Sequence, residues 1–198
     1  MTRKKAFKFN AASSKRAKEI VARYPEGRQA SAVMPLLDIA QRQNSGWLSR
    51  EAMEYVARYL DMPIIRVYEV ATFYTMYNLQ PVGRHLVQVC TCTPCWLRGS
   101  DAVLDACRKS LGVDVGETSD DGFATLMEVE CLGACVNAPM MQIDDEFFED
   151  LDAKSTAELF EFLKRGDRPK SGPQAGRRSS EPAGGPTTLR EISHLPKN

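Results

Sequence analysis

The sequence has few of the features that mark nucleotide enzymes, membrane proteins or nucleic-acid binders. It has only two histidines, His85 and His194, which offer no catalytic pair. It contains neither G-x-G-x-x-G nor G-x-x-x-x-G-K-[S/T], so we expect no nucleotide site in this chain. No apolar run approaches the roughly 20 residues that span a bilayer, and no apolar signal segment follows the basic start. We therefore expect a soluble, cytosolic protein without membrane insertion.

The net charge is zero, with 26 basic and 26 acidic residues, so no global charge predicts binding to nucleic acid. This balance hides an uneven distribution. Residues 111–163 contain fourteen acids and one base, Lys154, whereas seven bases and no acid precede Glu19. The chain is mostly basic again from Lys164 onward. The pattern indicates either charged docking surfaces or simply solvated faces.

Apolar residues at helical spacing fill the first part of the chain. Four stripes repeat at i, i+3, i+4 and i+7 and predict helices within residues 13–80. Ser49 is a natural N-cap for the third helix, and Pro63 suits the first turn of the fourth. Short turns make such helices antiparallel neighbours, which predicts an N-terminal helical bundle over residues 1–80. The stripes are Ala17, Ile20, Val21 and Tyr24; Val33, Leu36, Leu37 and Ala40; Met53, Val56, Ala57 and Leu60; and Val67, Val70, Ala71 and Tyr74.

The hydrophobic period changes after Pro81. Ser100 is expected to cap a helix that carries Val103, Leu104 and Cys107 and is closed by Gly112. Short runs that are apolar or alternate between apolar and polar residues predict strands. These runs are residues 85–90, 123–130, 140–143 and 147–149.

A last helix is predicted from the capping box Ser155-x-x-Glu158 to Gly166. The resulting order, β-α-β and then β-β-α, is that of a thioredoxin-like layer with a parallel crossover. From Asp167 the chain is rich in Pro, Gly, Ser and Arg, and we expect it to be disordered or laid along a partner. The predicted fold class is α/β: the bundle, a thioredoxin-like domain over 81–166 and an extended tail over 167–198.

Five of the six cysteines fall in two loops, each of which follows a predicted strand. Cys90, Cys92 and Cys95 lie in the first loop, and Cys131 and Cys135 lie in the second. In a cytosolic protein, cysteines are metal ligands or redox thiols more often than disulfides. Neighbouring strand ends can bring both loops to one edge of the sheet. Four thiolates converging there would meet the requirement of an iron–sulfur cluster, whose irons are each held by two protein sulfurs.

Other interpretations of these cysteines compete. A Cys92-x-x-Cys95 dithiol would make the chain a stand-alone thioredoxin-like redox protein, but the other loop cysteines would stay unexplained. Structural zinc prefers two-residue gaps, of which only one is present. A plant-type ferredoxin needs a third cysteine where Arg98 stands. Cys107 stands apart on an apolar helical stripe and is expected in the core. The choice between Cys90 and Cys92 as a ligand is open at this point.

Three stretches of the sequence resemble a known family. They are VYEVATFYTMYN, the first cysteine loop followed by LRGS, and VECLGACVNAP. The similarity extends from about Phe7 to RSSEPAGGPTTL in the tail. These motifs resemble the thioredoxin-like [2Fe–2S] subunit, the E subunit, of respiratory NADH:quinone oxidoreductase, complex I, of the alphaproteobacterial and mitochondrial type. The family commonly has threonine or another small residue at the place of Cys92, which leaves open whether Cys92 competes for iron.

The resemblance implies an electron carrier with one [2Fe–2S] cluster on Cys90, Cys95, Cys131 and Cys135. It implies that the cluster exchanges single electrons with FMN, and that FMN and NADH are bound by a partner subunit. The large iron–sulfur subunit of complex I would be a second partner. The activity would be that of the whole proton-translocating NADH-quinone oxidoreductase, with no substrate site in this chain. Its place would be the cytoplasm, peripheral to the inner membrane, or the mitochondrial matrix in a eukaryote.

Overall fold

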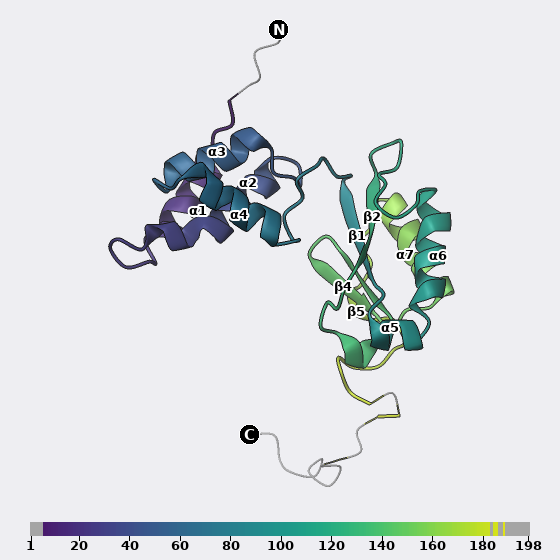
Figure 1. Cartoon of the computed structure of the whole chain (residues 1–198). Helices are drawn as coiled ribbons and strands as arrows, with labels where there is room; N and C mark the ends of the chain where they lie inside the picture. The colour runs from purple at the N-terminus through teal and green to yellow at the C-terminus, as the bar shows by residue number, and fades with distance from the viewer. Residues whose placement is uncertain (1–5, 183, 186–187, 189–198) are drawn as a thin grey trace. The chain divides into compact units, whose positions relative to one another are not determined.

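A helical unit is followed along the chain by an α/β unit (Figure 1). The computed structural model describes residues 6–182, 184–185 and 188. The two units divide between Arg84 and His85, and each has its own buried core. The other residues of the predicted tail over 167–198, including His194, lie outside the described residues. Across the described residues, we find no helix with the length and apolarity needed to cross a membrane.

The helical unit forms because the predicted apolar stripes meet in one core. Leu36, Leu37, Val56 and Val67 are each 0% exposed there. The Ser49 side chain accepts a hydrogen bond from the backbone of the next helix, which confirms its predicted role as an N-cap. The elements are α1 (Ala11–Val21), η1 (Gln29–Ala32), α2 (Val33–Gln43), α3 (Arg50–Tyr59) and α4 (Ile64–Phe73).

The ends of α4 differ from the prediction. Pro63 is the N-cap and not part of the first turn, with an extended ψ of 133°. Tyr74 follows the helix and is 40% exposed, so it does not belong to the buried stripe. Both deviations lie at helix termini, where the spacing of apolar residues carries little information about the boundary.

The α/β unit contains one five-stranded sheet in the order β2-β1-β3-β4-β5. The β1–β2 and β4–β5 pairs are parallel, and the two pairs between them are antiparallel. Helices α6 and α7 lie side by side against one face (Figure 1). The elements are β1 (His85–Cys90), α5 (Thr93–Leu97), α6 (Ser100–Leu111), β2 (Ala124–Val129), η2 (Cys135–Asn137), β3 (Met140–Ile143), β4 (Glu146–Glu149), α7 (Ala153–Lys164) and β5 (Gly172–Pro173). This arrangement confirms the predicted thioredoxin-like layer.

Two helix starts in this unit were predicted wrongly. The N-cap of α6 is Gly99, with a φ of 94°, and Ser100 is already the first helical residue. Helix α7 starts earlier than predicted, because Asp152 is its N-cap and forms a capping box with Ser155. A carboxylate and a hydroxyl both satisfy free backbone N–H groups, so either residue type can mark a helix start.

The beginning of the predicted tail belongs to the sheet. Gly172 and Pro173 pair with Phe148 and Glu149, which makes β5 an edge strand. The expectation of disorder is wrong for these two residues. Composition predicted too little apolar burial, but the contact is made by backbone hydrogen bonds and does not depend on apolar burial.

The packing of the α/β core can be tested by substituting two phenylalanines of α7. Phe160 and Phe162 lie on the same helix, and they are 0% and 43% exposed. Replacing Phe160 with Ala should lower the free energy of unfolding by about 3–5 kcal/mol, because it leaves a cavity. The matched change Phe162→Ala should cost less than about 1 kcal/mol. Urea unfolding followed by circular dichroism measures both, and equal losses would contradict the assignment of the core.

Candidate metal centre

The pairing of β1 with β2 brings the two cysteine loops together. The strands are parallel, and Cys90 at the end of β1 is in register with Val129 at the end of β2. Both loops therefore leave the sheet side by side. Strand β3 runs antiparallel to β1 with Val89 opposite Met141, so the chain enters β3 at this same end. The segment that enters β3 is the second cysteine loop.

The first loop contributes two buried thiols. Cys90 is 2% exposed as the last residue of β1, and Cys95 is 1% exposed within α5. Burial, followed by a hydrogen bond with Cys90, raises the pKa of Cys95 to about 12. The backbone N–H of Met140 acts in the opposite direction on the pKa of this thiol. Cys92 precedes α5 as its N-cap and is half-buried.

The second loop contributes a pair of exposed thiols. The Sγ atoms of Cys131 and Cys135 lie 3.3 Å apart. Their hydrogen bond lowers the pKa of Cys131, and the backbone N–H of Gly133 lowers it further. The same hydrogen bond raises the pKa of Cys135, so Cys131 is the more acidic thiol of the pair. Gly133 has a φ of 89°, a conformation that glycine adopts without the strain of a side chain.

The two loops meet through their sulfur atoms. Cys135 interacts electrostatically with Cys90 and Cys92, and Cys92 also forms a hydrogen bond with Cys131. The structure thus brings together all four predicted ligands, and Cys92 lies beside them. Within each loop, a direct sulfur contact joins two predicted ligands: Cys90 with Cys95, and Cys131 with Cys135. In the described part of the chain, no three histidine, cysteine or acidic side chains converge as the ligands of a single metal ion would, whereas a binuclear cluster needs only two protein sulfurs at each iron.

This donor set fits a binuclear iron–sulfur cluster. Each iron of such a cluster takes two protein sulfurs, and each loop here supplies one pair in contact. Ala138 and Met140 pack with Cys90 and Cys95 in a small apolar cluster, which shields one pair from water. Backbone N–H groups of Gly133 and Met140 point at sulfur atoms of both pairs, an arrangement that stabilises thiolates.

One carboxylate lies beside each cysteine loop. The Glu128 Oε1 atom accepts a hydrogen bond of 2.7 Å from the Thr91 hydroxyl, so this side chain is held next to the first loop. Glu130 immediately precedes Cys131 and acts to raise the pKa of that thiol. Glu130 therefore places negative charge beside the exposed pair, and Glu128 places it beside the first loop.

Cys107 lies away from this site, as predicted. It is 0% exposed, and burial raises its pKa to about 12. Its Sγ atom lies 3.9 Å from the sulfur of Met141 in the core of the α/β unit. His85 also lies away from the cysteines, at the other end of β1, with its Nδ1 atom 2.7 Å from an Asp144 carboxylate oxygen.

Sequence reasoning missed the contacts behind the second cysteine loop. Asn137 ends η2 and is 2% exposed, and its side chain donates hydrogen bonds to Glu149 and to the backbone of Ser179. Arg177 of the tail donates to the carbonyl of Val136. The sequence carries no pairing signal for the two contacts with the tail, because each joins residues about 40 positions apart through a single hydrogen bond.

Comparisons with known proteins agree with this geometry. The family model described as thioredoxin-like [2Fe-2S] ferredoxin matches residues 17–164. The NADH-quinone oxidoreductase E subunit of Rickettsia conorii is 54% identical over 158 residues, which cover 80% of this chain and 95% of that protein. The mitochondrial NADH dehydrogenase [ubiquinone] flavoprotein 2 of Dictyostelium discoideum is 49% identical over 185 residues, covering 93% of this chain and 75% of that protein.

A solved structure shares the fold. A crystal structure of an NAD+-reducing [NiFe]-hydrogenase in the air-oxidized state matches with a TM-score of 0.57 and 19% identity, over 66% of this chain and 23% of that chain. At this identity the match supports the fold alone. The sequence matches carry the assignment further. The chain belongs to the thioredoxin-like [2Fe–2S] ferredoxin family, in the group of NADH-quinone oxidoreductase E subunits, and its cofactor is one [2Fe–2S] cluster.

Proposed function

We propose that this chain is the electron-carrier subunit of an NADH-quinone oxidoreductase, complex I. Its [2Fe–2S] cluster is held by Cys90, Cys95, Cys131 and Cys135 and exchanges single electrons with FMN in the neighbouring NADH-oxidising subunit. The observation that carries this proposal is the meeting of two thiol pairs at one end of the sheet. The 54% identity to the Rickettsia conorii protein supports the assignment to that complex.

The two pairs would have different surroundings. When bound, the cluster supplies a one-electron redox centre. Cys90 and Cys95 hold one side of it inside the protein, where the apolar contacts of Met140 exclude water. Cys131 and Cys135 present the other side at the surface. With the cluster bound, Cys131 and Cys135 would hold the side open to a partner, and electrons would enter or leave there because electron transfer favours a short path.

The remaining components of the reaction belong to other subunits. FMN and NADH bind to the NADH-oxidising partner, and the large iron–sulfur subunit is the second neighbour. The chain acts as part of a proton-translocating enzyme and carries no substrate site of its own. It lies in the cytoplasm at the inner membrane as a peripheral component, or in the mitochondrial matrix if the source is eukaryotic.

The alternative of a dithiol redox protein is not favoured by the site. A Cys92–Cys95 dithiol would need an accessible thiol of low pKa. Cys95 is 1% exposed and its pKa is raised to about 12. Cys92 is in contact with Cys131 of the other loop, which a dithiol mechanism would not require.

The choice of ligands predicts a clear difference between cysteine variants. Cys131→Ser or Cys135→Ser should abolish or strongly perturb the EPR signal of the reduced cluster, because one iron loses a thiolate. The same loss is expected for Cys90→Ser and Cys95→Ser. The matched control Cys92→Ser should keep a normal spectrum. If Cys92→Ser destroys the signal and Cys90→Ser spares it, the ligand from the first loop has been chosen wrongly.

The carboxylates beside the cluster should hold its reduction potential low. At ~8 Å and an effective dielectric constant of ~20, one carboxylate opposes reduction by about 2 kcal/mol, or about 90 mV for one electron. Glu128 and Glu130 are exposed, so water screens part of this effect. Changing both to Gln should raise the midpoint potential by tens of millivolts in a redox titration, on the order of half that limit.

The control for this prediction is Glu146→Gln. Glu146 is also exposed, but it begins β4 next to the hairpin at the opposite end of the sheet. Its substitution should leave the potential unchanged. A potential that stays the same in the Glu128→Gln/Glu130→Gln protein, or moves equally in the control, would argue against local carboxylate electrostatics.

The function itself is tested by reduction through the flavoprotein partner. The purified full chain should contain two irons and two sulfides, as its cluster requires. When the chain is mixed with the FMN-containing NADH-oxidising subunit, NADH should produce the EPR signal of the reduced cluster. NADH without that subunit should produce no signal, because this chain binds no nucleotide. A bound zinc ion in place of iron, or a cluster that the flavoprotein cannot reduce, would refute the proposal.

A further inference from the structure

A segment of the tail is fastened to the α/β unit directly behind the second cysteine loop. We call residues 172–181 the tail strap. The strap begins as β5, which pairs with the end of β4. The backbone N–H of Gln174 then donates a hydrogen bond of 2.9 Å to the carbonyl of Glu149. The strap therefore continues along the sheet edge toward the end of the unit that carries the cysteines.

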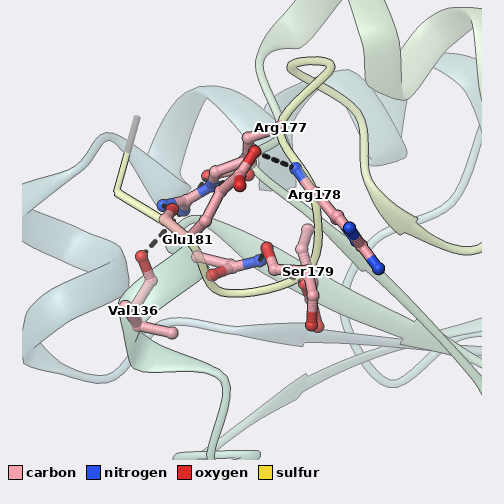
Figure 2. A network of polar contacts seen from close by, with 8 residues as sticks. Val136, Arg177, Arg178, Ser179 and Glu181 are labelled. Carbon is pink, nitrogen blue, oxygen red and sulfur yellow. Dashed lines mark hydrogen bonds and ion pairs between the residues drawn. The ribbon is translucent and has the colours of Figure 1, made fainter. Parts of the chain in front are cut away.

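Arg177 is the centre of the polar network that follows (Figure 2). Its guanidinium forms two hydrogen bonds with the Asp150 carboxylate, and these side chains are only 12% and 10% exposed. The same guanidinium donates to the carbonyl of Val136 at 2.8 Å and to the carbonyl of Glu181 at 3.0 Å. Four donated hydrogen bonds thus join the strap, the end of β4 and the cysteine loop at one side chain.

A second link runs parallel to the first. The Asn137 side chain donates to the carbonyl of Ser179 at 3.0 Å, and the carbonyl of Asn137 accepts from the N–H of Asp150 at 2.7 Å. Val136 and Asn137, which follow Cys135 in η2, are therefore both held in place. The strap itself holds them, together with Asp150, to which the strap is bound. Figure 2 shows Val136, Arg177 and Ser179 within this one polar network.

The first two residues of η2 are not held by burial. Val136 is 63% exposed and Cys135 is also exposed, so apolar burial does not fix this part of η2. A carbonyl bound by a half-buried charged donor is a stronger restraint than a neutral surface contact. The Val136 carbonyl belongs to the peptide between Val136 and Asn137, so its hydrogen bond restrains the backbone one residue beyond Cys135 and limits how far the Cys135 side chain can move.

We propose that Arg177 is a positioning residue for the [2Fe–2S] site, and that the tail strap holds Cys135 at its iron. The inference rests on the proposed function, in which Cys135 is a ligand. The strap thus extends the cluster-binding apparatus to a tail residue 42 positions beyond that ligand. Removal of the guanidinium lets the second loop open and exposes its iron to solvent and chelators.

The test compares Arg177→Gln with Arg178→Gln in the full chain containing its cluster. Arg178 is the exposed neighbour, and its contact with Glu181 is made by its backbone N–H, which the substitution keeps. Release of iron to a ferrous chelator should become about tenfold faster in Arg177→Gln, which corresponds to ~1.4 kcal/mol in the opening of the loop. The control should release iron at the wild-type rate.

Spectroscopy separates positioning from simple loss of stability. In Arg177→Gln the EPR g values and the midpoint potential of the cluster should shift, because the sulfur of Cys135 changes its geometry. Arg177→Lys keeps the charge but loses the forked geometry, so it should restore the wild-type values only in part. Unchanged release rate, g values and potential in Arg177→Gln, or equal changes in Arg178→Gln, would overturn the proposal.

Asp150→Asn provides a second route if Arg177→Gln does not fold. It removes the charge that orients the guanidinium and should change iron release in the same direction. Where Arg177→Gln does fold, the double variant Arg177→Gln/Asp150→Asn should release iron no faster than the more affected single variant, since both act through one network. Additive effects would refute a shared network. A wild-type chain that never holds two irons would instead refute the proposed function, so the two failures are distinguishable.

Discussion

The parallel pairing of β1 with β2 is the constraint on which the site depends. The register places Cys90 opposite Val129, so the two cysteine loops begin as neighbours before any contact between sulfurs is made. A shift of one residue would turn the side chain of Cys90 to the other face of the sheet. The register is fixed by burial, since Val87, Val89 and Leu126 are each 0% exposed. The core of the α/β unit therefore determines the geometry of the metal centre.

The site combines a rigid half with a half that needs support. Cys90 and Cys95 are buried among apolar groups, and the packing that stabilises the fold also orders them. Cys131 and Cys135 are exposed, as an electron carrier requires if its partner is to approach the cluster closely. Exposure removes the restraint that packing would give. Hydrogen bonds from the tail strap to η2 supply a restraint without covering the sulfur atoms.

The helices and strands differ in how well the sequence predicted them. The apolar stripes of α1 to α4 and the succession of β1 to β4 along the chain were predictable, because burial imposes a fixed period on helices and strands. The starts of helices were less predictable. Gly99 and Asp152 are the N-caps of α6 and α7, where Ser100 and Ser155 were expected. The pairing of the tail with β4 was not predictable, because a strand of two residues has no period to detect.

The sequence by itself determined the chemistry of this protein. The residue types and spacings in the two loops limit the ligands to thiolates, and their positions after strands imply one shared edge. Only the tertiary structure decided how the thiols pair, where Cys92 lies relative to them, and that Arg177 reaches the loop from the tail. Sequence patterns report which face of an element is buried. Contacts between distant polar groups depend on where the packed elements place them, and no local period encodes that.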